Sequence, residues 1–223
     1  FTLNLDIATI YGPNFKSYGM INWHESLTNS LRLMKKEEFI QNSYELHEEF
    51  TGWDNEESVV EENPYEEYKL TKKVNWINLN GEPKIEFSGR CIGGCLDVVK
   101  DLIGTKYDKV KEYIQKYKND GIVWFLESFE TSTPGLYRTL WQMKNSGYFE
   151  NCRGIIFGRP LMMREEYEIS YYEATKDALD ELNIPIIMDA DIGHLAPQIP
   201  IVNGAILEVK SENGKGSIKN IFK

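Results

Sequence analysis

The chain has 223 residues, of which 41% are hydrophobic and 13% aromatic, and its formal net charge is −10. This composition excludes a disordered chain, and the length suffices for one large domain or two small ones. The acidic balance disfavours nucleic acid as a partner, because binding phosphates needs a clustered basic face. No apolar run approaches the roughly 18–20 residues of a membrane span and no signal peptide opens the chain, so no membrane partner is expected.

Cysteine usage bears on compartment and on metal binding. The three cysteines, Cys91, Cys95 and Cys152, cannot all pair, so reduced thiols and a cytoplasmic location are expected. Cys91 and Cys95 have no histidine close by in the sequence, which disfavours a zinc site, and we expect neither a metal nor another cofactor. The chain begins at Phe1, without a methionine and in mid-pattern, which predicts a fragment of a longer protein.

Strands and helices alternate along the chain, which predicts an α/β fold. A first strand is expected over residues 7–11 and a helix over residues 22–41. Residues 37–68 are acidic with interleaved aromatic side chains. That pattern is typical of a solvent-exposed surface loop. The alternative, which assigns the segment a function, is a mobile lid over a pocket.

The rest of the chain shows apolar runs separated by glycines and by amphipathic stretches. Residues 89–94 predict a glycine-rich turn, but they lack the GxGxxG spacing that cradles a nucleotide phosphate. The other expected elements are strands over residues 74–79, 84–87, 122–126, 154–158, 184–188 and 205–209, the last of them final in the chain, and helices over residues 95–103, 135–146 and 165–182.

Two strand ends carry groups suited to acid–base chemistry. Glu127 follows the buried strand 122–126, and His194 lies in a Gly-His loop after the strand 184–188. Imidazole titrates near neutral pH, and a carboxylate beside it can orient it. The pair therefore predicts the base and the orienting group of a catalytic triad. A surface or helix-capping glutamate and a purely structural histidine are the alternatives.

A nucleophile is harder to place. The sequence has no Gly-x-Ser-x-Gly elbow. Cys95 follows two glycines and opens a predicted helix, whose dipole would lower the pKa of the thiol. A cysteine hydrolase that uses Cys95 is therefore one alternative.

Four ordered segments resemble the LD-carboxypeptidase family of serine peptidases, which includes the microcin C self-immunity peptidases. The similar segments are GRCIGG at residues 89–94 with LIGT at 102–105, FLE at 125–127 with YRTL at 137–140, GYF at 147–149 through GR at 158–159, and IP at 184–185 through GHLAP at 193–197. The resemblance implies a C-terminal LD-carboxypeptidase-like domain of mixed strands and helices over residues 74–223. An acidic linker over residues 46–73 and a remnant of an N-terminal α/β domain over residues 1–45 would precede it.

The resemblance also implies a Ser-Glu-His triad, with Glu127 as the orienting carboxylate and His194 as the general base. The serine of the family would lie upstream of Phe1, outside this chain. Two residues depart from the family pattern: Cys95 stands in place of the loop asparagine, and Ser128 in place of the aspartate after the glutamate.

The implied activity is hydrolysis of an amide bond at a free carboxyl end by a homodimer. The substrate would be an L,D-peptide of a muropeptide or a microcin C-type aminoacyl-nucleotide. Trp53 on the acidic loop, or else Trp76, would contact this substrate, and Arg159 would help to bind it. A non-catalytic peptide-binding domain of the same fold is the alternative from another functional class.

Overall fold

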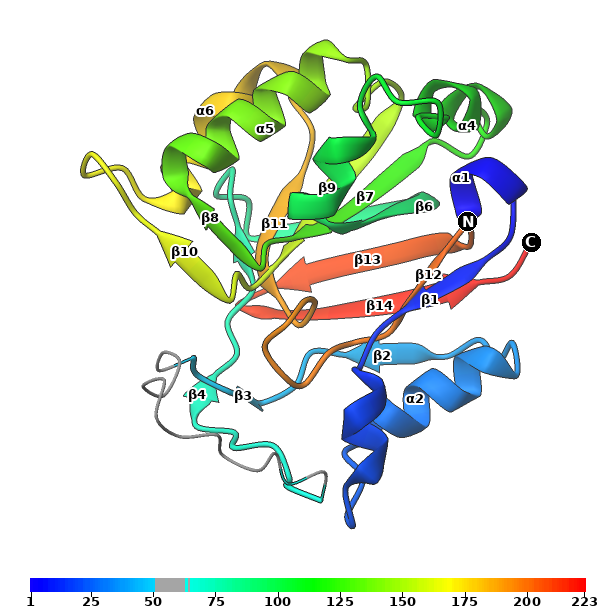
Figure 1. The fold of residues 1–223 in the computed structure, drawn as a ribbon, viewed down its shortest axis with the longest axis vertical. Coiled ribbons are helices and arrows are strands. Elements are labelled where there is room, and N and C mark those ends of the chain that lie inside the picture. Colours follow the sequence, from blue (N-terminus) through cyan, green and yellow to red (C-terminus); the bar gives the residue numbers. More distant parts are fainter. Residues whose placement is uncertain (51–62, 64) are drawn as a thin grey trace.

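The computed structural model describes residues 1–50, 63 and 65–223, and its centre is an eight-stranded mixed sheet (Figure 1). The strand order is β2-β14-β13-β6-β7-β9-β11-β5. The four parallel strands are β6 (Lys84–Cys95), β7 (Ile122–Glu127), β9 (Cys152–Gly158) and β11 (Ile186–Ala190). The antiparallel strands that flank them are β13 (Ile206–Glu212), β14 (Lys215–Ile221), β2 (Ile40–Asn42) and β5 (Ile77–Asn78). The α/β class predicted from the sequence is confirmed.

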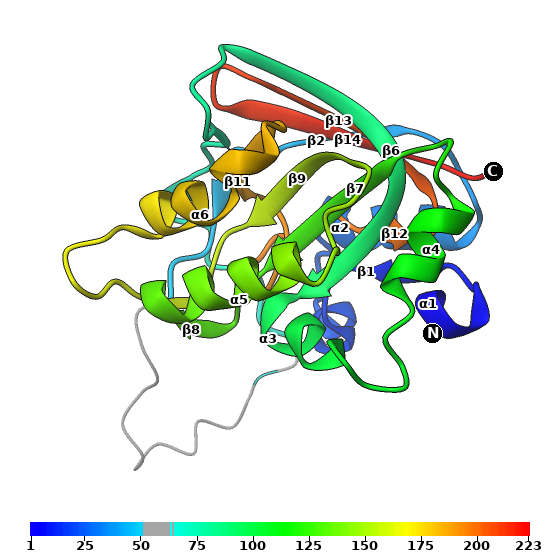
Figure 2. The same cartoon turned by 90° about the horizontal axis from the view of Figure 1, so that it is seen from above.

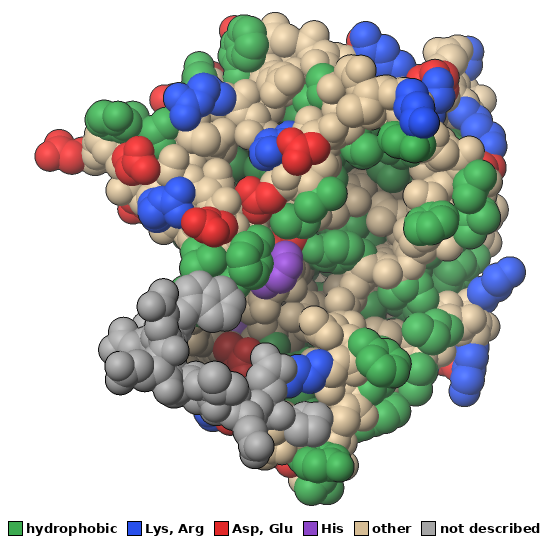
Figure 3. All heavy atoms as spheres, viewed as in Figure 1, with side chains coloured by type: hydrophobic (Ala, Val, Ile, Leu, Met, Phe, Trp, Pro, Cys, Tyr) green, Lys and Arg blue, Asp and Glu red, His purple; other side chains and the backbone are tan. Residues whose placement is uncertain are grey.

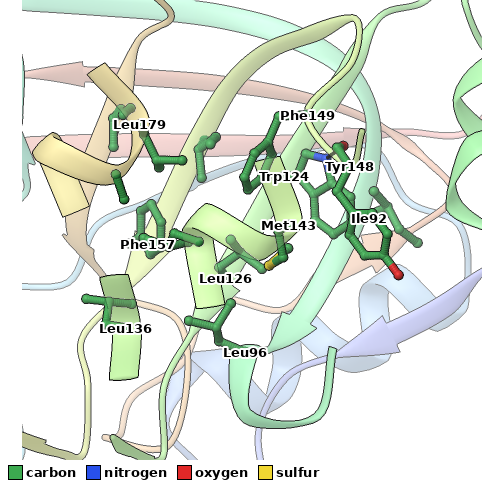
Figure 4. Packing of buried hydrophobic residues seen from close by; sticks show 14 of the residues in the cluster. Ile92, Leu96, Trp124, Leu126, Leu136, Met143, Tyr148, Phe149, Phe157 and Leu179 are labelled. Carbon is green, nitrogen blue, oxygen red and sulfur yellow. Dashed lines mark hydrogen bonds between the residues drawn. The ribbon is translucent and has the colours of Figure 1, made fainter. Parts of the chain in front are cut away.

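The helices that connect the parallel strands lie on one face of the sheet, as Figures 1 and 2 show. These connecting helices are α3 (Leu96–Val99) and α4 (Val110–Lys116) between β6 and β7, α5 (Thr133–Asn145) between β7 and β9, and α6 (Tyr171–Leu179) between β9 and β11. An apolar core fills the space between these helices and the sheet, with Trp124 of β7 and Met143 of α5 close together in Figure 4. All six residues of β7 are buried, because both faces of a parallel strand are covered.

The opposite face of the sheet carries a second apolar core, which includes Phe125 of β7 and Trp76. Outside the large sheet, β1 (Thr9–Tyr11) pairs with β12 (Ile201–Asn203), and α2 (Glu25–Met34) lies beyond β2 in Figure 1. The remaining elements are α1 (Thr2–Leu5) and two small pairs, β3 (Leu46–His47) with β4 (Lys72–Lys73) and β8 (Glu130–Ser132) with β10 (Met162–Arg164). No helix in the described part of the chain is long and apolar enough to cross a membrane.

The glycine-rich segment 89–94 is a strand, not the turn that its composition predicted. It is part of β6, which runs for twelve residues. A Cβ atom on Gly93 would lie 1.8 Å from the carbonyl oxygen of Phe125 on the neighbouring β7. Glycine is therefore needed here for the close approach of two strands and not for a change of chain direction.

Several predicted boundaries also shift. The helix expected over residues 165–182 begins only at Tyr171, where Ser170 and Glu173 form a reciprocal capping box. The helix expected over 22–41 ends at Met34, and residues 40–42 form β2 instead. The strand expected over 205–209 is not the last, because a turn at Asn213 and Gly214 leads into β14. Both turn residues have positive φ, as a tight hairpin requires, and the Asn-Gly pair was a readable signal.

The predicted division at residues 45 and 73 stays a prediction. Strands from residues 1–45 pair with strands from residues 74–223. Strand β2 pairs with β14 in the large sheet, and β1 pairs with β12. Residues 1–45 thus pack directly against the part of the chain that carries His194.

Candidate active site

The carboxyl ends of the parallel strands meet at one edge of the sheet and bring chemically useful side chains together there. Cys95 ends β6 and is in register with Glu127, which ends β7. His194 lies in the loop that follows β11. This is the edge at which α/β proteins with open parallel sheets place their sites.

The loop after β11 must cross the end of β9 to reach Glu127, and two glycines make that crossing possible. A Cβ atom on Gly158, the last residue of β9, would lie 2.2 Å from the carbonyl oxygen of Ile192. Gly193 has φ of +107°, and a Cβ atom there would lie 2.8 Å from Oε2 of Glu127. Close packing over both glycines sets how near the histidine comes to the carboxylate.

A buried carboxylate anchors the base of the same loop. Asp191 has no exposed surface, and its Oδ1 accepts a hydrogen bond from Nη1 of Arg159 at 2.7 Å. Its Oδ2 accepts from Nε1 of Trp76 at 2.9 Å and from the backbone N–H of Tyr44 at 3.3 Å. Burial raises the pKa of Asp191, and the Arg159 guanidinium opposes that rise.

Glu127 and His194 are hydrogen-bonded to each other, as the sequence predicted. Nδ1 of His194 lies 2.8 Å from Oε2 of Glu127, whose side chain is fully buried, whereas 38% of the histidine side chain is exposed. The hydrogen bond to the carboxylate raises the pKa of His194, while partial burial opposes that rise. With its Nδ1 proton directed to Glu127, the neutral ring presents Nε2 as a base.

Two aromatic residues complete the surroundings of this pair. The Tyr11 hydroxyl donates to Oε1 of Glu127 at 2.5 Å, so both carboxylate oxygens have a donor. Burial, together with the negative charge of Glu127, raises the pKa of Tyr11, which keeps this hydroxyl protonated. The ring of Phe129 packs edge-on against His194, with 4.8 Å between the ring centroids.

Cys95 lies beside the pair, but its thiol is not activated in the way that the sequence predicted. Burial and the charge of Glu127 raise the pKa of Cys95 to about 12. The expected lowering by a helix dipole is wrong, because α3 has only four residues and the carboxylate lies close to the sulfur. A protonated thiol disfavours the cysteine hydrolase alternative.

A cavity of about 360 Å³ opens next to His194. A histidine side chain is visible in the hollowed middle of the face in Figure 3. Charged residues of both signs line the cavity, among them Lys16, Glu48, Glu67 and Lys69. A small molecule with positive and negative groups fits such walls better than an apolar one.

The other predicted site residues have different outcomes. Trp53 lies outside the described residues. Trp76, the alternative to Trp53, is 2% exposed and donates to Asp191, a location that disfavours its contact with a substrate. Arg159 is 5% exposed and paired with Asp191, a location that favours a role in holding the His194 loop. Its direct contact with substrate stays a prediction.

Sequence reasoning missed Tyr11, Asp97 and Asp191. Asp97 accepts hydrogen bonds from the backbone N–H of Phe129 at 2.8 Å and from the Cys95 thiol, whose sulfur is 3.6 Å from Oδ2. Tyr11 lies 116 residues before its partner Glu127, so no local pattern relates the two. Asp191 lies two residues before Gly193 and three before His194, and an acidic residue directly after a buried strand was a usable signal.

A strand-end carboxylate hydrogen-bonded to an imidazole beside a polar cavity is an arrangement suited to acid–base chemistry at the edge of an α/β sheet. Residues 88–209 match the protein family described as the LD-carboxypeptidase C-terminal domain. Because that match takes in more than half of the chain, the chain belongs to the LD-carboxypeptidase family. Comparison with curated proteins gives no significant match.

Solved structures share the fold. An MccF-like protein from Bacillus anthracis str. Ames is 22% identical with a TM-score of 0.71, covering 100% of this chain and 63% of that protein. The microcin C7 self-immunity protein MccF in complex with glutamyl sulfamoyl guanosine is 20% identical with a TM-score of 0.69, at the same coverages. The muramoyltetrapeptide carboxypeptidase from Oxalobacter formigenes is 14% identical with a TM-score of 0.66, covering 96% of this chain and 61% of that one. The chain thus spans less than two thirds of the length of these structures.

Proposed function

We propose that the chain is the glutamate- and histidine-bearing part of a serine carboxypeptidase that hydrolyses an amide bond at a free carboxyl end. The observation that carries this proposal is the hydrogen bond of 2.8 Å between Nδ1 of His194 and Oε2 of Glu127 at the rim of a polar cavity. Membership of the LD-carboxypeptidase family supports the reaction class.

In the proposed reaction, Nε2 of His194 takes the proton of a serine hydroxyl as that oxygen attacks the amide carbonyl. The same nitrogen then returns the proton to the leaving amine, and a water molecule repeats the cycle to release the acyl group. Glu127 keeps the ring in the required tautomer and stabilises the imidazolium that forms. Tyr11 holds the second oxygen of the carboxylate and so fixes its orientation.

The nucleophile is proposed to belong to a segment outside residues 1–223, in a Gly-x-Ser-Asp turn before Phe1. The hydrogen bonds of the described residues include none between a serine hydroxyl and His194. The solved relatives are longer than this chain, which is compatible with such a segment.

Two substrate classes agree with the mixed charges of the cavity. One is an L,D-peptide of a muropeptide, and the other is a microcin C-type aminoacyl-nucleotide. Two solved structures of the similar protein MccF are complexes with glutamyl sulfamoyl guanosine and with aspartyl sulfamoyl adenosine, which supports the second class. Contact of Trp53 and Arg159 with the substrate, a homodimeric state and a cytoplasmic location belong to the same proposal.

The deciding experiment assays the full-length protein against an L,D-tetrapeptide and an aminoacyl-sulfamoyl adenosine. We expect one of them to be hydrolysed, with the rate falling about 10³- to 10⁴-fold or more in His194→Ala. A coding sequence without a Gly-x-Ser-Asp segment shortly before Phe1 would contradict the proposal. It would favour the non-catalytic peptide-binding domain, which should bind such peptides without cleaving them.

A further inference from the structure

Cys95, Glu127 and His194 form a compact cluster of three different donor types. The sulfur of Cys95, a carboxylate oxygen of Glu127 and a ring nitrogen of His194 all lie within 4.8 Å of one another. The sequence disfavoured a zinc site because no histidine stands near the cysteines. The fold supplies that histidine from the loop after β11, at the far end of the parallel part of the sheet.

Thiolate, imidazole and carboxylate are the ligands that Zn²⁺ prefers in proteins. Zinc–ligand bonds of about 2.0–2.3 Å in tetrahedral geometry place the donor atoms about 3.3–3.6 Å apart. The separations in this cluster are at most 4.8 Å, so the longest of them has to shorten by no more than about 1.2–1.5 Å to reach such values. Three protein donors leave a fourth position open, as in zinc sites that keep a water molecule or bind a substrate.

Access and support for an ion are both present. The histidine side chain is 38% exposed next to the cavity, so an ion can enter, whereas the glutamate side chain has no exposed surface. The Tyr11 hydroxyl donates to Oε1 of Glu127. Such contacts to ligating side chains orient them and strengthen metal binding.

We propose that Cys95, Glu127 and His194 form a binding site for a thiophilic divalent cation such as Zn²⁺, and that the bound ion blocks the histidine as a base. Binding replaces the thiol proton of Cys95, which passes to solvent, by a metal–sulfur bond, and no oxidation is involved. Glu127 gives the ion the carboxylate lone pair that otherwise accepts the Nδ1 proton of His194. When Nδ1 binds the ion, that proton moves to Nε2 within the neutral ring, so Nε2 can no longer take a proton; when Nε2 binds the ion, its lone pair is used directly. The metal site does not rest on the proposed hydrolase function, whereas the blocking of His194 as a base does.

The test titrates the purified full-length protein with Zn²⁺ by calorimetry and, separately, with Co²⁺ by absorption spectroscopy. We expect one Zn²⁺ per chain and a thiolate-to-cobalt charge-transfer band in the near ultraviolet. Cys95→Ser removes the soft donor with little change in size, and we expect it to abolish the band and weaken Zn²⁺ binding by about 100-fold or more. Cys152→Ser is the matched control, because this partly buried thiol begins β9 at the opposite end of the strand from the site.

The absence of a cobalt–thiolate band in the unmodified protein would overturn the proposal, whatever the variants do. Zinc binding that survives Cys95→Ser, or that falls equally in Cys152→Ser, would overturn it as well. Circular dichroism of each variant checks that the fold is intact. Hydrolysis measured on metal-free protein, before and after one equivalent of Zn²⁺ is added, separates the two proposals. A metal-free protein without activity sinks only the hydrolase, whereas activity that a bound Zn²⁺ leaves unchanged sinks only the blocking of His194.

Discussion

The parallel half of the sheet and the antiparallel hairpin β13–β14 differ in where they place their polar side chains. Parallel strands place all their carboxyl ends at one edge, so Cys95, Glu127 and the His194 loop meet there although they are far apart in the chain. In the hairpin, buried and exposed residues alternate along β13 and its charged side chains face solvent. A carboxylate is therefore placed beside an imidazole at the edge, whereas the carboxylates of the hairpin face solvent.

The strongest way to test this contrast is a matched pair of isosteric changes. Glu127→Gln should lower the hydrolysis rate of the full-length protein by about 10³- to 10⁴-fold, because an amide no longer fixes the tautomer of His194 or stabilises its cation. Glu212→Gln changes an exposed carboxylate of β13 in the hairpin. Steady-state kinetics should show no change for this control. Equal losses in both variants would mean that the two regions do not differ as proposed.

Ion pairs offer a second comparison, this time in stability. Arg159→Met leaves the fully buried Asp191 without its cation, and we expect a loss of about 3–5 kcal/mol in the free energy of unfolding. Lys210→Met removes an exposed pair with Glu86 and should cost less than about 1 kcal/mol. Urea denaturation followed by fluorescence measures both. A similar small loss in the two variants would show that the Asp191 anchor contributes little to the fold.

A smaller effect is expected from Tyr11, which acts through Glu127. Tyr11→Phe removes only the hydroxyl and leaves Oε1 of a buried carboxylate without this donor. The hydrolysis rate should fall about tenfold, with KM unchanged, because the change disturbs the orientation of Glu127 and not the cavity. Tyr117→Phe, which removes a hydroxyl that donates to the exposed Asp6, serves as the control. A rise in KM at constant kcat would instead assign Tyr11 to substrate binding.

The smallest effect to detect is a shift in titration. Glu127 raises the pKa of His194 above the ordinary value of 6.5, so the midpoint seen by NMR should lie above 6.5 and fall in Glu127→Gln. Since the neutral ring is the base, activity should rise with pH through that raised midpoint. The interaction of the protonated His194 ring with the Glu127 carboxylate stabilises the fold fully below about pH 6.5. This contribution is lost as pH rises through the raised pKa of His194. A midpoint that Glu127→Gln leaves unmoved would contradict the assigned hydrogen bond.

Local patterns predicted a good part of this molecule. Continuous apolar runs located β7, β9 and β11, because strands covered on both faces must be apolar throughout. Once the strands were located, Glu127 at the end of β7 and His194 after β11 could be predicted as site residues. The glycines of residues 89–94 misled, since the local sequence does not reveal whether a missing side chain serves a turn or the close approach of a neighbouring strand.

The sequence by itself determined the fold class, the family, and the candidate residues Glu127 and His194 of the proposed triad, because each depends on residue type and short-range spacing. Only the tertiary structure decided that Tyr11 binds Glu127, that Trp76 and Arg159 anchor Asp191, and that Cys95 joins the carboxylate and the imidazole in one cluster. These contacts join segments that no sequence period connects. They arise because parallel strands, wherever they lie in the chain, bring their ends to a common edge and so decide which side chains meet.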